Sequence, residues 1–189
     1  MKNFNFSLFL SLFFLIILLP ESVDAKRINK KVDEQGVDMP KVRIAPFKGD
    51  KACAISYTFD DALRDQSILA APMLEKYGFR GTFWAIPSMV PETEEEILTN
   101  SKKKWGGITW KRLKEMSDNG HEISNHGWSH KNLVNLKSEQ EIRAEIEKAD
   151  SLILLKIGKK PRTFCYPYNA FNDQVLAIAM ENRVDTRTR

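Results

Sequence analysis

Short apolar runs alternate along the chain with segments whose apolar residues recur at helical spacing. The apolar runs predict strands, and the periodic segments predict helices. The expected strands cover 52–59, 80–86, 121–124, 163–166 and 184–186, and the expected helices cover 63–77, 109–116, 138–157 and 173–181. This alternation is typical of an α/β fold in which right-handed βαβ units form a parallel sheet, with the chemistry at the carboxyl ends of the strands.

Residues at the ends of the periodic segments support these helix boundaries. Thr109 is a suitable N-cap, and Ser138-Glu139-Gln140-Glu141 matches a capping box. Gly78 and Gly158 follow the last periodic residues of two helices, where glycine commonly ends a helix. The segment 87–107 has no clear period and contains a run of Glu and a run of Lys, so we expect a surface excursion there.

The first 50 residues have a different pattern from the rest. Lys2, the apolar run 8–19 and the small-residue pattern Val23-Asp24-Ala25 are typical of a signal peptide. The apolar run is shorter than the roughly 20 residues that a bilayer span needs, and an uncleaved membrane anchor is the alternative. We predict a signal peptide over 1–25, an arm or linker over 26–50 and a domain over 51–189. This predicts a secreted or periplasmic protein with no stable membrane span after cleavage.

Composition narrows the classes of partner. The formal net charge is +4, and basic residues mostly stand beside acidic ones, which indicates a solvated surface and no nucleic-acid partner. Cys53 and Cys165 both lie in apolar runs. Two buried free thiols are the favoured interpretation, and a disulfide between them is the alternative that export permits.

Two carboxylates, Asp60 and Asp61, close the first apolar run. At the end of a strand the chain turns, so two adjacent side chains can reach one site. A metal-dependent hydrolase needs this division of labour, because one carboxylate binds the cation while the other accepts a proton from water. An Asp-Asp pair is also common in turns and at helix N-caps, so the pair alone does not decide between these roles.

Two of the three histidines, His126 and His130, follow the third expected strand. Their spacing of four residues lets one helical turn bring both imidazoles within reach of one metal ion; a chance pair of surface histidines is the alternative. Gly127 stands where a zincin carries Glu, which argues against a metalloprotease. His121 begins the strand, and we expect a structural or supporting role for it.

Pro167 and Tyr168 follow the fourth expected strand. Proline there can fix a sharp turn and direct a main-chain N–H into a pocket, as an oxyanion requires, although a turn with aromatic packing is the simpler interpretation. All three clusters stand at carboxyl ends of expected strands, and parallel strands bring such ends to one edge of a sheet.

These motifs resemble those of the polysaccharide deacetylase family, the NodB-homology domain. The resemblance rests on Thr58-Phe59-Asp60-Asp61, His126-x-x-x-His130 and Pro167-Tyr168, and on the neighbouring phrases at 77–83 and 120–126. It covers about 52–189. It implies an incomplete, irregular (β/α) barrel that acts on acetylated polysaccharides or oligosaccharides.

The resemblance also implies a role for each site residue. Asp61, His126 and His130 would bind a divalent metal, usually zinc, and Asp60 would be the catalytic base. Tyr168, following Pro167, would supply a backbone N–H to the oxyanion at the substrate-binding site. The expected reaction is hydrolysis of N-acetyl groups, with O-acetyl (xylan) esterase action or a non-catalytic carbohydrate-binding relic as the alternatives.

Three departures from the family pattern matter. Ala62 replaces a Gly, which is tolerable where φ is negative. Cys165 replaces an Arg that orients the base in many members, so Asp60 is expected to lack that cation. The chain ends at Arg189, before a late Leu-x-His motif that provides the general acid in relatives. We therefore expect a domain whose C-terminal part is missing, with an unpaired sheet edge and an uncovered apolar face.

Overall fold

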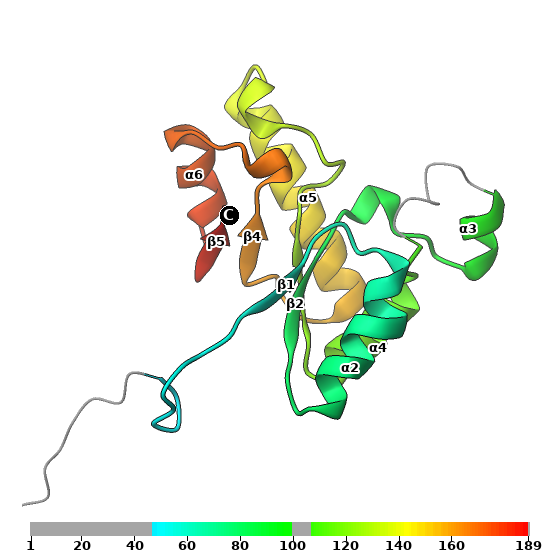
Figure 1. Ribbon diagram of the computed structural model, residues 1–189. Coiled ribbons are helices and arrows are strands. Elements are labelled where there is room, and N and C mark those ends of the chain that lie inside the picture. The colour runs from blue at the N-terminus through cyan, green and yellow to red at the C-terminus, as the bar shows by residue number, and fades with distance from the viewer. Residues whose placement is uncertain (1–46, 100–106, 189) are drawn as a thin grey trace, which may run out of the picture. The chain divides into compact units, whose positions relative to one another are not determined.

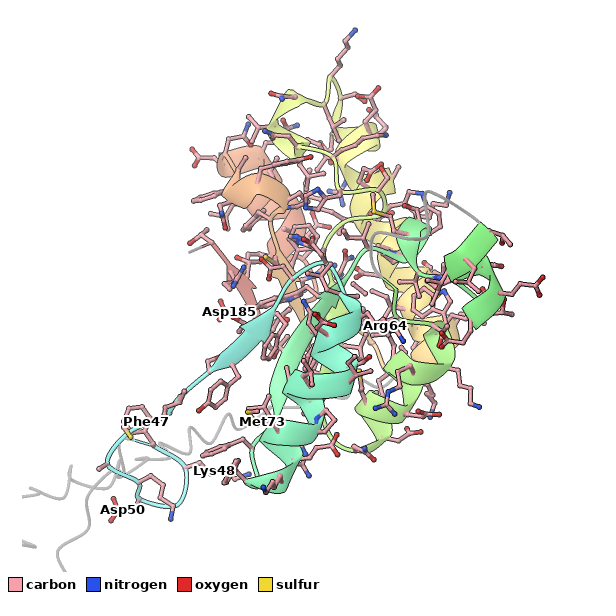
Figure 2. The ribbon with its side chains drawn as sticks, turned by 45° about the vertical axis from the view of Figure 1, so that its right-hand side comes forward. Phe47, Lys48, Asp50, Arg64, Met73 and Asp185 are labelled. Atoms are coloured by element: carbon pink, nitrogen blue, oxygen red, sulfur yellow. The ribbon has the colours of Figure 1, made fainter. Side chains whose placement is uncertain are left out.

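The protein is described by a computed structural model that covers residues 47–99 and 107–188. The predicted signal peptide and most of the predicted arm lie outside these residues. Residues 53–189 form one compact unit, and the preceding residues belong to another. Of that other unit, the structure describes a turn in which the Asp50 N–H donates to the Phe47 carbonyl over 3.0 Å, and Figure 2 labels both residues.

Five parallel strands form one sheet, as the alternating pattern predicts (Figure 1). Their order in the sheet is their order in the chain, β1-β2-β3-β4-β5, and each pairs in parallel with the next. A sheet that adds every new strand on the same side winds like a barrel, whereas a doubly wound sheet reverses direction. The strands are β1 Tyr57–Phe59, β2 Gly81–Ala85, β3 Glu122–Asn125, β4 Thr163–Cys165 and β5 Asp185–Arg187.

Helices connect successive strands. They are α2 Ala71–Lys76, α3 Glu94–Thr99, α4 Trp110–Asp118, α5 Glu139–Ile157 and α6 Asp173–Met180, and a π-helical segment Gln66–Ala70 leads into α2. The predicted caps are present. Thr109 Oγ1 accepts the Arg112 N–H over 3.3 Å, Ser138 Oγ accepts the Glu141 N–H over 3.2 Å, and Gly158 ends α5 with a left-handed φ of 78°. The Glu141 carboxylate accepts from the Lys137 N–H, one residue before the N-cap that a capping box would use.

The two faces of the sheet differ in chemistry. Alternate side chains of one face, including Phe83, Ile123 and Phe164, are buried in the hydrophobic core, where α4 and α5 pack on β3. The other face carries hydrogen-bonded groups: Trp84 Nε1 donates to Thr163 Oγ1 over 3.0 Å, and that hydroxyl donates to Glu122 over 3.0 Å. This polar face lines the inside of the curl.

The sheet curls so far that its first and last strands approach each other. Arg187 of β5 donates to Thr58 Oγ1 of β1 over 3.1 Å, although these strands stand at opposite edges of the sheet. The result is a half-barrel with helices outside, which confirms the incomplete (β/α) barrel. Figure 2 shows β5, marked by Asp185, and Met73 on α2.

Exposed apolar side chains occur both on helices and in the loops between elements. Ile68, Leu69 and Met73, in the π-helical segment and α2, are all exposed. These three exposed apolar side chains lie on the helical segment that follows β1.

The predicted start of the first strand and the predicted burial of Cys53 were wrong. The first strand begins at Tyr57 rather than at 52, because its parallel pairing with β2 starts at Tyr57 and Gly81; Cys53 lies before this point and is exposed. Cys165 is buried as expected, and neither cysteine forms a disulfide. The segment 87–107 contains the short helix α3, none of whose residues is buried, so this part of the segment lies at the surface as expected. In the described part of the chain, no helix has both the length and the apolar character that a bilayer span requires.

Candidate metal centre

The carboxyl ends of β1 and β3 bring Asp61, His126 and His130 together. Asp61 Oδ1 lies 3.4 Å from His126 Nε2 and 3.5 Å from His130 Nε2. One donor atom from each residue lies within 4.8 Å of the other two. The structure therefore assembles the three side chains that the sequence motifs single out, from segments more than 60 residues apart.

The spacing of these donor atoms fits a shared cation. Two ligand atoms about 2.0–2.2 Å from a tetrahedral zinc ion are about 3.3–3.6 Å apart, whereas an N–H···O hydrogen bond is normally about 2.9 Å long. Asp61 Oδ1 is buried and has no hydrogen-bond partner among the described residues. A buried carboxylate oxygen without a partner is unfavourable unless a cation satisfies it. One carboxylate and two imidazoles are also a donor set that zinc accepts.

A main-chain carbonyl orients the first imidazole. His126 Nδ1 lies 2.8 Å from the Cys165 carbonyl oxygen, which can only accept, so Nδ1 carries the proton. In a neutral ring, Nε2 then presents its lone pair to Asp61 and to the position of the cation. This is the supporting hydrogen bond that metal-binding histidines usually make.

Buried polar side chains hold the segment between the two histidines. Asn125 Oδ1 accepts the Gly127 N–H over 2.7 Å, and its amide donates to Asp150 over 2.7 Å. Glu145 of α5 accepts both the N–H and the hydroxyl of Ser129 over 2.9 Å. Sequence reasoning did not identify Glu145, although a charged residue beside Ile146 on the apolar stripe of a helix was a usable signal.

The electrostatics of the metal-free site favour an ion pair between ionised Asp61 and protonated His126. The contact with His126 lowers the pKa of Asp61 despite its partial burial, and His130 contributes in the same direction. Burial acts to lower the pKa of His126, but the interactions with Asp61 and Cys165 outweigh it and raise this pKa to about 10. Burial and the charge of His126 lower the pKa of His130. A cation must therefore displace a proton from His126 to bind.

The second carboxylate has a cationic partner, which corrects the expectation that the replacement at Cys165 leaves Asp60 without one. Arg187 Nη2 lies 2.5 Å from Asp60 Oδ2 and 3.3 Å from Cys165 Sγ. Asp60, His126 and Cys165 also offer donor atoms within 4.8 Å of one another. The guanidinium beside both Asp60 and Cys165 repels a second cation there, so the Asp61 cluster is the better metal site.

A family model described as "Polysaccharide deacetylase" matches residues 48–186. The chain belongs to the polysaccharide deacetylase family. It is 30% identical to chitin deacetylase 1 of Cryptococcus neoformans over 124 residues, which are 66% of this chain and 23% of that protein. The deacetylase PplD of Streptococcus pyogenes, solved with acetate, superposes with a TM-score of 0.57 at 20% identity over 85% of this chain and 61% of the other.

A structure described as a CE4 family pseudoenzyme of Bacillus anthracis also shares this fold, with a TM-score of 0.52 and 22% identity over 69% of this chain and 41% of the other. The chain spans less than half the length of the curated relatives it matches. Membership of the polysaccharide deacetylase family therefore does not by itself assign a reaction to this chain.

The third sequence motif, Pro167-Tyr168, forms a turn beside the cluster of Asp61, His126 and His130. Pro167 is buried and begins a 3₁₀ turn, and Tyr168 has a left-handed φ of 60°. The Tyr168 ring centroid lies 4.7 Å from that of His130. The two rings border an open groove of about 480 Å³, whose other lining residues are Lys131, Asn132, Asn135 and Leu136.

Ala62 does not meet the condition under which alanine would be tolerated. It has a φ of 51°, and Asp61 before it has a φ of 70°. An L-residue in this region costs about 1–2 kcal/mol relative to its preferred conformations. The turn that directs Asp61 into the cluster is therefore strained at Ala62, whose methyl group is buried.

His121 lies at the opposite end of β3 from the cluster. Its Nδ1 accepts the Gly81 N–H over 3.0 Å, and its Nε2 lies 3.1 Å from Glu75. These contacts connect β3 to β2 and α2, which is the structural role expected for this histidine.

Proposed function

We propose that this polysaccharide deacetylase is a metal-dependent hydrolase that removes acetyl groups from N-acetylated sugar polymers or oligomers. The observation that carries the proposal is the contact of Asp61 with both His126 and His130, directly beside a second carboxylate. Structural aspartates and histidines rarely leave a buried carboxylate oxygen without a hydrogen bond.

The proposed reaction divides the work among four residues and one backbone group. A divalent cation, zinc in this proposal, would be held by Asp61, His126 and His130, and would supply Lewis acidity that polarises the acetyl carbonyl and acidifies water. Asp60 accepts the proton of the attacking water. The backbone N–H of Tyr168, in the turn after Pro167, donates to the oxyanion as the carbonyl carbon becomes tetrahedral.

The groove beside His130 suits an extended polar substrate. It is open, and it presents the Tyr168 ring, the amides of Asn132 and Asn135, and the Lys131 ammonium. An aromatic face with several donors and acceptors fits a sugar ring and its hydroxyl groups. We propose that the polymer lies in this groove with one acetyl group directed at the cluster.

Acetate release tests this proposal. Purified full-length protein is assayed with chitin oligomers and with peptidoglycan, in the presence of Zn²⁺ or of a chelator. We expect release that is lost with the chelator and reduced at least about 100-fold in Asp60→Asn. Asp65→Asn is the matched control, because Asp65 is an exposed carboxylate near the same turn. Release that persists both with the chelator and in Asp60→Asn would refute the mechanism, and no release from any substrate would favour the non-catalytic alternative.

One observation favours ester substrates as a second candidate. Apart from His126 and His130, the chain has one histidine, His121, and it lies at the far end of β3. Among the residues that the structure describes, the imidazoles at the cluster are the two proposed ligands. An alkoxide leaves without a proton donor more readily than an amine does. Faster acetate release from acetylated xylan than from chitin oligomers would favour the esterase.

Export belongs to the same proposal. If residues 1–25 are a signal peptide, the mature protein begins at Lys26. N-terminal sequencing of the protein recovered outside the cytoplasm tests this, and an intact Met1 on the exported protein would contradict cleavage.

A further inference from the structure

We propose that Arg187 is the positioning residue of Asp60, and that it fixes the carboxylate of the proposed base through a contact between the first and last strands of the sheet. This inference rests on the proposed function for its kinetic consequence. The contact itself can be tested without any activity.

Arg187 makes four contacts with one guanidinium. Nη2 lies 2.5 Å from Asp60 Oδ2, and Nη1 lies 3.1 Å from Thr58 Oγ1. Nη2 is also 3.3 Å from Cys165 Sγ, and Cζ lies 4.7 Å from the centroid of the Trp84 ring. The planar group is thus held on a ring face and at two of its edges, an arrangement that the flexible, single-headed side chain of lysine cannot reproduce.

The contact leaves the two oxygens of Asp60 in different states. Oδ2 is bound to Arg187, while Oδ1 is buried and has no hydrogen-bond partner among the described residues. The Asp60 main chain is held as well, because Gln66 donates to its carbonyl oxygen over 2.6 Å. With the backbone and Oδ2 both fixed, Oδ1 is the oxygen left to accept a proton.

The register of the last strand pair places Arg187 where this contact is possible. Arg187 of β5 is paired with Cys165 of β4, and the small Cys165 side chain leaves room for the guanidinium. A register shift of one residue would turn Arg187 to the opposite face of the sheet. The position of the base therefore depends on a strand that begins more than 120 residues after it.

A purely structural role does not account for these contacts well. The side chains of Arg187 and Asp60 are 32% and 35% exposed, and ion pairs with this much exposure contribute little to folding. The reaction rate depends more strongly on such a contact than folding stability does, because a displacement of a reacting group by about 1 Å can reduce the rate about 100-fold.

Arg187→Met and Arg187→Lys test the kinetic consequence in the full-length protein. We expect Arg187→Met to lower kcat for acetate release by about 10- to 100-fold, with KM changed less than about twofold because Arg187 does not line the groove beside His130. Arg187→Lys should recover part of the lost kcat, because lysine keeps the positive charge but lacks the two planar donor groups of the guanidinium. Zinc affinity, measured by competition with a chromophoric chelator, should be unchanged, because Arg187 contacts none of the three proposed ligands. Arg162→Met, an exposed arginine before β4, is the matched control and should match the parent protein.

A double-mutant cycle tests the contact without activity. Arg187→Met, Asp60→Asn and the double variant are unfolded with urea. If the two side chains interact, the change in the unfolding equilibrium constant of the double variant should differ by about threefold or more from the product of the two single changes.

The outcomes separate this inference from the proposed function. Absence of acetate release by the parent protein would refute the proposed function, while the cycle would still report on the contact. Additive unfolding effects would refute the contact. Coupled unfolding with an unchanged kcat in Arg187→Met, in a parent protein that releases acetate, would refute the positioning role.

Discussion

Replacing Glu145 by Gln is expected to weaken metal binding although Glu145 is not a proposed ligand. Its side chain is 7% exposed and accepts two hydrogen bonds from Ser129, the residue before His130. It also pairs with Lys131 over 3.0 Å. A glutamine has nearly the same shape but no charge. Its amide N–H₂ would replace one of the two carboxylate oxygens, so one of the two Ser129 donors would lose its acceptor.

The magnitude follows from these contacts. A hydrogen bond to a charged acceptor contributes about 1.5–3 kcal/mol, and the substituted glutamine can keep one acceptor of two. The Lys131 pair adds little because the lysine is largely exposed. We therefore expect the metal-free protein to lose about 2 kcal/mol of unfolding free energy. Supporting residues of metal ligands typically change metal affinity about 10- to 100-fold, and we expect weakening of that size.

The assay compares zinc affinity, by chelator competition, with urea unfolding in metal-free protein. Glu147→Gln is the matched control on the same helix, because Glu147 is 62% exposed and pairs with Arg143 at 3.4 Å. The reasoning is refuted if Glu145→Gln binds zinc as tightly as the parent protein, or if Glu147→Gln weakens binding to the same degree.

Three further predictions concern stability. Ala62→Gly should change the unfolding free energy by less than about 1 kcal/mol, because relief of the left-handed conformation offsets the lost methyl burial; Ala62→Val should cost more than about 2 kcal/mol in urea unfolding, and equal effects would contradict the strain. The pKa of His126 is raised from 6.5 to about 10 in the metal-free site. Its contribution to the free energy of unfolding is therefore fully present below pH 6.5 and is lost as the pH rises to about 10. Thermal midpoints of chelated protein should therefore fall over this range more steeply than those of His126→Gln, and parallel profiles would contradict the assignment. Asp150→Asn should cost about 3 kcal/mol in urea unfolding, because it leaves the Arg183 side chain, 3% exposed, without its ion-pair partner; a loss below about 1 kcal/mol would contradict this.

Local pattern was sufficient to predict where the cluster assembles. Asp61 and His126 each follow an apolar run, and a parallel sheet brings the carboxyl ends of such runs to one edge. Caps such as Thr109 and Ser138 were equally predictable, because their hydrogen bonds span three residues.

Contacts between distant segments were not predictable in this way. The pairing of Arg187 with Asp60 depends on how strongly the sheet curls, and no periodicity reports that curl. The exposure of Cys53 depends on where β1 starts to pair with β2, which is a property of both strands. The left-handed φ of Ala62 arises because the chain must direct Asp61 into the cluster, a demand that a single sequence does not reveal.

The groups expected to bind metal or substrate are held by segments that emerge later during synthesis. Helix α5 holds the residue before His130, the carbonyl of Cys165 orients His126, and β5 holds Asp60. When only the first half of the domain has left the ribosome, the proposed ligands have been made, but the later residues that hold them in place have not. Tight zinc binding would then have to wait until α5 and β4, which carry Glu145 and Cys165, have been made and have packed against the ligands.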